Sequence, residues 1–249
     1  AASDVYKRQV AGKVVSTEKN EKLGTTTYKL SNGAIVCLKP TDFKNDEILF
    51  KGSKFGGFSA YAGKDYQSGQ YCNNVTEEMG YGEFSKTDLE KFLSGKVVNV
   101  TPVVVDYTEY VSGSSSVKDM ETMFQLIYLK CTEPRKDMEA FTSYVTRSKQ
   151  QLQLLKQNPE NLFVDTVYNT LYQGNPRAHH IDSPKDYDMI NVDNAIAFYK
   201  DRIGNPSGMY YTFVGSFSED KIKPLIEKYI GGIPAGKSKA EYKSLGMNI

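Results

Sequence analysis

The clearest pattern along the chain is the helical spacing of apolar residues after Ser116, a residue that favours a helix start. Six apolar residues recur three and four positions apart, as on one face of an α-helix: Met120, Met123, Phe124, Ile127, Tyr128 and Cys131. Weaker periodicity and capping residues predict further helices over residues 65–79, 87–93, 136–157, 161–172, 193–202 and 218–230.

Runs rich in Val, Thr and Tyr predict the strands. Residues 25–30 and 34–40 flank Ser31-Asn32-Gly33, a turn suited to a tight hairpin. Further strands are predicted over 47–55, ending at Gly56-Gly57, and over 209–217, and two more within 97–114, broken near Pro102 or Asp106. Because these strands do not alternate regularly with helices, we expect an α+β fold with a largely antiparallel sheet and helices packed on one face.

The ends of the chain differ from its centre. Residues 1–23 are polar and without pattern, so we expect them to be unfolded, with Ala1 to Gln9 as an appended leader. Residues 24–235 are expected to form the domain. The chain starts without Met, and its polar end, residues 236–249, is expected to be a linker to a following domain of a longer protein.

Composition excludes several functions. Thirty-one Lys and Arg against thirty Asp and Glu leave a net charge of +1, so nucleic acid is a poor candidate partner. No run of eighteen apolar residues is present, so no membrane span is expected. The only histidines, His179 and His180, are adjacent and point in different directions, which does not allow a His-rich metal site.

Several segments together resemble a domain of the pitrilysin/insulinase family of zinc peptidases, the inverzincins. The most similar segments are YKLSNGAIVCLKP, GYGEFSKTDLEKFLSGK, VSGSSSVKDMETMFQLIYLKCTEPRKDMEAF, NPENLFVDTVYNTLYQGNPRA and YYTFVGSFSEDKIKPLIEKYIGGIP. The resemblance implies two halves that close around a chamber, each with two related α+β domains, and zinc bound in one half.

The zinc half of this family carries HxxEH on a helix, with both His as zinc ligands and the Glu as general base. The corresponding residues here are Asn74, Glu77 and Glu78, so both ligand positions have changed. Alignment on Asn158-Pro159 puts the third-ligand position at Gln151. A carboxylate without a metal-bound water has no acidic water to deprotonate. The resemblance therefore implies a domain of the non-catalytic second half, with no catalytic or metal-binding residue of its own.

The implied partners are the catalytic half of the same polypeptide, which would hold the zinc, and a peptide substrate whose binding residues are unknown. The edge of the sheet within residues 97–110 is a hypothetical site for an added peptide strand. Bacterial relatives suggest a periplasmic or envelope location. One alternative is a stand-alone binding or structural protein derived from this family. Another is an active metalloenzyme whose rearranged site uses Glu77, Glu78 and either His179 or His180.

Overall fold

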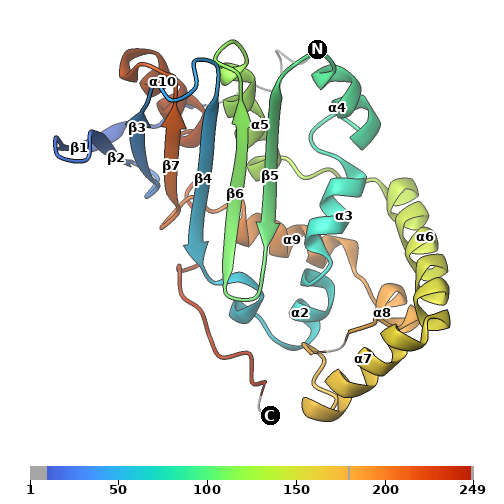
Figure 1. The fold of residues 1–249 in the computed structure, drawn as a ribbon. Coiled ribbons are helices and arrows are strands. Elements are labelled where there is room, and N and C mark those ends of the chain that lie inside the picture. Colours follow the sequence, from blue (N-terminus) through green and yellow to red (C-terminus); the bar gives the residue numbers. More distant parts are fainter. Residues whose placement is uncertain (1–9, 179, 248–249) are drawn as a thin grey trace.

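The fold is built on one seven-stranded sheet with helices behind it (Figure 1). The computed structural model describes residues 10–178 and 180–247. The strand order is β1-β2-β3-β7-β4-β6-β5, and only β3 and β7 pair in parallel. This confirms the α+β fold with a largely antiparallel sheet. The strands are β1 (Val14–Asn20), β2 (Thr25–Leu30), β3 (Ile35–Pro40), β4 (Ile48–Phe55), β5 (Val98–Val104), β6 (Thr108–Ser115) and β7 (Tyr210–Gly215).

The helices lie behind the sheet and beside it (Figure 1). None within the described residues is long and apolar enough to cross a membrane. Their bounds are η1 (Gly57–Ala60), α2 (Gly63–Gly69), α3 (Cys72–Met79), α4 (Lys86–Leu93), α5 (Met120–Thr132), α6 (Met138–Gln157), α7 (Pro159–Leu171), α8 (Pro184–Asp188), α9 (Val192–Arg202), α10 (Glu219–Leu225) and the π-helical turn η2 (Ile226–Ile230).

Local signals in the sequence placed many of these elements correctly. The β2–β3 hairpin turns at Asn32-Gly33, where Gly33 has a φ of 90° that disfavours other residues. The Asn32 side chain donates hydrogen bonds to the carbonyl oxygens of Ile230 (2.8 Å) and Ile233 (2.9 Å), which ties the hairpin to the end of η2. Ser85 caps α4 as predicted, because its side chain accepts from the Asp88 backbone N–H.

Strand β1 lies in the segment that was expected to be unfolded. Val14–Asn20 pairs antiparallel with β2 at the edge of the sheet, which corrects that expectation for this part of residues 1–23. Every side chain of β1 except that of Val14 is exposed, so the strand carries no alternation of apolar residues to reveal it. The expected leader, Ala1 to Gln9, lies outside the described residues.

Three of the predicted helices differ from the structure in their limits or in their capping residue. The single helix expected over residues 65–79 is divided into α2 and α3, and the break follows Gly69, against which the ring of Phe198 packs directly. Helix α5 begins only at Met120, because Ser116 caps the turn before it by accepting a hydrogen bond from the Asp119 N–H. Helix α9 is capped by Asn191 rather than by Asp193.

The main core lies between the sheet and helices α5, α9, α10 and η2. Along β4, Ile48 and Phe50 are buried toward the helices, whereas Leu49 and Phe55 are exposed on the other face. The ring of Phe213 on β7 stacks between the rings of Phe50 and Phe124, with centroid distances of 5.3 and 5.1 Å. One face of the sheet is therefore packed and the other is open.

A second, smaller core joins the helices beside the sheet. Val75 and Met79 of α3 pack with Tyr144 of α6 and Ala195 of α9. Because α3 is fixed through these residues, the polar positions on its remaining surface are held next to α6. This contact is the one that positions the candidate site.

A buried cluster of charges supports the lower end of the sheet. Glu109 on β6 is fully buried, and its Oε1 accepts from Nε (3.0 Å) and Nη2 (2.6 Å) of Arg202 on α9. Its other oxygen accepts from the Gly57 N–H at 2.5 Å. The Lys54 ammonium lies 3.7 Å from the same carboxylate. Burial lowers the pKa of Lys54 to about 8 even though Glu109 acts in the opposite direction.

Candidate functional site

The candidate site is the surface of α3, which carries the positions that correspond to HxxEH. Asn74 and Glu77 are exposed and Glu78 is partly buried. Asn74 and Glu78 are four residues apart, so both lie on the side of α3 that faces α6. Glu77 lies on a different side of the helix.

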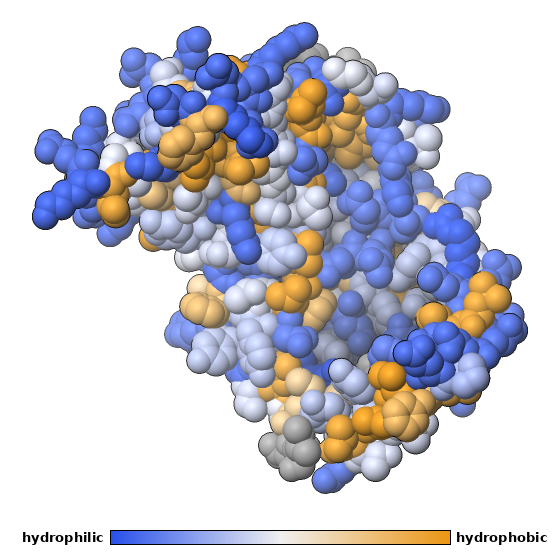
Figure 2. Space-filling view, viewed as in Figure 1, coloured by the Kyte–Doolittle hydropathy of each residue, from blue (hydrophilic) through white to orange (hydrophobic). Residues whose placement is uncertain are grey.

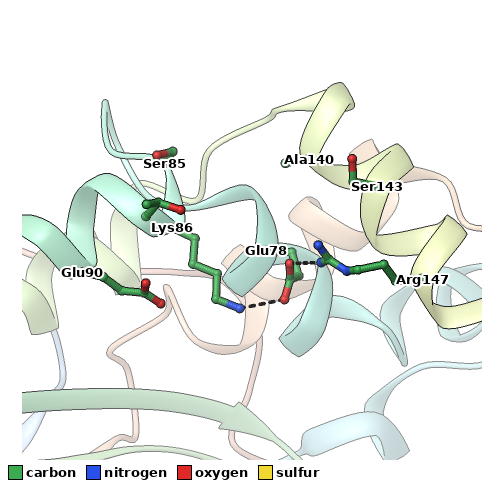
Figure 3. A pocket seen from close by; sticks show the side chains of 8 residues that line it. Glu78, Ser85, Lys86, Glu90, Ala140, Ser143 and Arg147 are labelled. Carbon is green, nitrogen blue, oxygen red and sulfur yellow. Dashed lines mark hydrogen bonds and ion pairs between the residues drawn. The ribbon is translucent and has the colours of Figure 1, made fainter. Parts of the chain in front are cut away.

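Glu78 binds two cationic side chains (Figure 3). Its Oε1 accepts from Nζ of Lys86 on α4 at 2.7 Å, and its Oε2 accepts from Nη2 of Arg147 on α6 at 2.5 Å. Burial acts to raise the pKa of Glu78, but the hydrogen bonds and charges of Lys86 and Arg147 outweigh it and hold that pKa below its usual value. The carboxylate is therefore ionised at neutral pH, and its negative charge is balanced by Lys86 and Arg147.

These three residues border a polar pocket of about 460 Å³ between α3, α4 and α6. Figure 3 shows the Lys86 and Arg147 side chains reaching Glu78 from opposite sides. The charges of the two cations exceed the single charge of Glu78, and Glu90 on α4 also borders the pocket. A divalent cation would have to displace both side chains to reach the carboxylate, so this pocket is a poor metal site.

Asn74 and Gln151 border a second pocket, of about 300 Å³. The structure therefore brings together the first and third positions that the alignment compared with zinc ligands. His180 lines the same pocket, whereas His179 lies outside the described residues. Side-chain amides are weak ligands for zinc, which prefers thiolate, imidazole and carboxylate groups. Asn74 and Gln151 therefore border the same pocket, but their amide groups are poor zinc ligands.

Glu77, at the general-base position, lies outside both pockets. Its Oε2 accepts hydrogen bonds from the Tyr81 hydroxyl at 3.1 Å and from Nζ of Lys130 at 3.3 Å. Lys130 is buried in α5, so Glu77 serves as the counter-ion of a buried ammonium. Glu77 therefore has an ion-pairing role in the fold.

The alternative metal site that combines Glu77, Glu78 and a histidine gains no support from this geometry. Glu77 and Glu78 pair with different cations, and His180 lies in the pocket of Asn74. Within residues 10–178 and 180–247, no three His, Cys, Asp or Glu residues are grouped closely enough to hold a metal ion. The residues of this chain therefore do not fit the zinc that a catalytic pitrilysin-type site requires.

Sequence reasoning identified the changed motif but missed the residues that neutralise it. Lys86 is 8 positions and Arg147 is 69 positions from Glu78 in the chain. Neither belongs to a motif, and only the packing of α4 and α6 against α3 brings them to the carboxylate. The change of a ligand histidine to an acid was the one available signal that cations would lie nearby.

We expect replacement of both cations to change the titration of Glu78. In the variant Lys86→Gln/Arg147→Gln, burial then dominates and the pKa of Glu78 should rise, which ¹³C NMR of the side-chain carboxyl would measure. The lowered pKa of Glu78 means that its ionised form stabilises the folded state. This stabilisation is fully present above the pKa of Glu in the unfolded chain and is lost as pH falls through the pKa in the folded protein. At neutral pH the variant should therefore have a free energy of unfolding about 1 kcal/mol lower than that of the parent protein.

A matched control is Lys136→Gln, which breaks a more exposed ion pair with Asp193 of similar length, 2.7 Å. It should leave the titration of Glu78 unchanged and cost less than about 1 kcal/mol. An unchanged Glu78 pKa in the double variant would contradict the assigned role of Lys86 and Arg147.

The sequence is similar to those of named zinc proteases, although no family model matches the chain. It is 24% identical over 231 residues to a zinc protease PQQL-like protein of Arabidopsis thaliana, a match that covers 92% of this chain and 22% of that protein. It is 23% identical over 219 residues to the probable zinc protease PqqL of Escherichia coli K12, covering 88% of this chain and 23% of that protein.

The fold is shared with solved peptidase structures. The periplasmic protease PqqL from Escherichia coli matches with a TM-score of 0.76 and 22% identity over 94% of this chain and 25% of that one. The first half of the same protease matches with a TM-score of 0.68 and 13% identity, over 95% of this chain and 51% of that one. A peptidase M16 inactive domain from Pseudomonas fluorescens matches with a TM-score of 0.67 and 16% identity, over 89% of this chain and 53% of that one. The chain spans about a quarter of the length of the two zinc proteases named above and of the whole E. coli structure, and about half of the two shorter structures.

Proposed function

We propose that this chain, which belongs to the pitrilysin/insulinase family of zinc peptidases, is a non-catalytic domain of a longer zinc metalloendopeptidase. It forms part of the wall of a chamber in which peptides are cleaved. Zinc binding and hydrolysis take place in another half of the same polypeptide. The observation that carries this proposal is the neutralised motif on α3, where Glu78 binds Lys86 and Arg147 at a position where the catalytic family members have a zinc ligand.

Two comparisons support a place in the second half. The chain matches the whole E. coli protease better than it matches that protein's first half alone, by TM-score (0.76 against 0.68) and by identity (22% against 13%). The similarity to a peptidase M16 inactive domain agrees with this place. In this arrangement residues 24–235 are the domain, extended by β1, and residues 236–249 lead to the next domain.

The open face of the sheet is the surface that suits a chamber wall. Its central positions carry Lys51 and Ser53 on β4, Tyr110 and Ser112 on β6 and Thr212 on β7. Hydroxyl and aromatic groups can contact many peptide sequences without strong preference. Strand β5 is an edge of the sheet, but the Asn73 side chain binds both the N–H (2.9 Å) and the carbonyl oxygen (2.8 Å) of Val104, so an added peptide strand could pair only along the part of β5 before Val104. Pro102 is compatible with that edge position.

A periplasmic or envelope location and a bacterial source remain part of the proposal. The E. coli neighbour is described as periplasmic, and that description applies to the E. coli protein. The two-half architecture on one chain is taken from that protein and its relatives.

Zinc content tests whether zinc binding and hydrolysis belong to another half of the protein. The purified 249-residue chain should bind less than stoichiometric zinc, and a chelator should leave its melting temperature unchanged. The full-length protein should hold one zinc, and its cleavage of peptides should fall to background with the chelator, because hydrolysis requires a metal-activated water. Metal analysis and a peptide-cleavage assay measure both. Stoichiometric zinc and chelator-sensitive cleavage by the chain alone would contradict the proposal.

A further inference from the structure

Helix α7 has no buried residue, although it carries a stripe of apolar side chains. Phe163, Val167 and Leu171 are spaced four apart and therefore share one side of the helix. Phe163 is 68% exposed and Leu171 45% exposed. We call these three residues the α7 face. Figure 2 shows hydrophobic side chains gathered over α7 and the neighbouring part of α6.

An apolar helix side of this kind is normally covered. Most helix stability in proteins comes from packing of the apolar side, and α7 packs mainly on α6. Leu154 on α6, the helix against which α7 packs, is also 67% exposed. Contiguous exposed apolar surface marks an interaction site.

The path of the C-terminal segment points to the partner (Figure 1). After the last helix the chain runs back past the lower end of the sheet, where the Lys243 N–H donates to Oγ of Ser59 at 3.0 Å. Leu245 is buried, and the carbonyl oxygen of Gly246 accepts from Nδ2 of Asn175 at 3.1 Å. Asn175 lies in the loop that follows α7. The described chain therefore ends beside that helix.

The relatives indicate how much polypeptide follows in such proteins. This chain covers 53% of the M16 inactive domain from Pseudomonas fluorescens, which leaves room for a second unit of similar size. We propose that the polypeptide continuing beyond residue 249 folds into a second domain that packs on the α7 face. This inference rests on the proposed function, because it requires the chain to be part of a longer protein.

Cysteine labelling in the full-length protein tests the contact. The Phe163→Cys variant and, as a matched control, Asn169→Cys are each treated with a soluble maleimide, and labelling of the α7 peptide is followed by mass spectrometry. Asn169 is exposed on the opposite side of α7. We expect the Phe163→Cys thiol to react at least about tenfold more slowly than the control thiol, because labelling then requires the domains to open. In the 249-residue chain the two thiols should react at similar rates.

Several outcomes would overturn the inference. Equal rates in the full-length protein would show that the α7 face is open there. Protection that appears only at high concentration of the 249-residue chain would assign the face to a second copy, and protection that requires added peptide would assign it to substrate. A reading frame that ends at residue 249 would contradict both this inference and the proposed function, whereas a longer frame with equal rates contradicts this inference alone.

Discussion

Among single substitutions of charged residues in this domain, Glu109→Gln should lower the free energy of unfolding the most. Glu109 is the only carboxylate at hydrogen-bond distance from Arg202 among the described residues, and Lys54 lies beside it. Removing its charge leaves the buried Lys54 and Arg202 side chains beside a neutral amide, with the Asp201 carboxylate, 3.7 Å from Nη1 of Arg202, as the remaining anion. Breaking a buried ion pair in this way costs about 3–5 kcal/mol. Denaturant unfolding would measure the free-energy change, and the melting temperature should fall by roughly 10 °C.

Two further variants separate the burial of charge from a general loss of packing. Glu47→Gln removes the charge from an exposed pair with Lys44 and should change stability by less than about 1 kcal/mol. Adding Lys54→Met to Glu109→Gln should recover part of the loss, because one unpaired cation is removed. A double variant less stable than Glu109→Gln would indicate that shape rather than charge dominates at this site.

Structural features that depend on only a few neighbouring residues were predicted well. The hairpin at Asn32-Gly33 and the cap at Ser85 depend on backbone geometry that one or two residues determine. The α5 stripe is confirmed as core. The family resemblance is confirmed by the similarity to the PqqL proteases, which covers most of the chain.

Features that depend on distant neighbours were missed. Strand β1 is exposed on both sides, so only its pairing with β2 defines it. Glu109 and Arg202 are 93 positions apart, and Arg147 meets Glu78 from another helix. A sequence pattern reports which side of an element is apolar, but it does not report which elements meet. The changed motif was therefore visible, whereas the cations that neutralise it required the fold.

If the chain is part of a longer zinc peptidase, as proposed, the largest effect on activity should come from a glutamate outside it. In the full-length protein, Gln in place of the Glu of an upstream HxxEH motif should lower kcat for peptide cleavage by at least about 10²-fold, because the general base is lost. Glu77→Gln should leave kcat within about twofold, because Glu77 pairs with Lys130 and has no metal-bound water to deprotonate.

The comparison of these two variants in the same full-length protein is the most direct test of a non-catalytic role for this domain. We expect loss of cleavage with the upstream substitution and near-normal cleavage with Glu77→Gln, at unchanged zinc content. Loss of cleavage with Glu77→Gln in a folded, zinc-loaded protein, or a reading frame that contains no HxxEH motif, would contradict it.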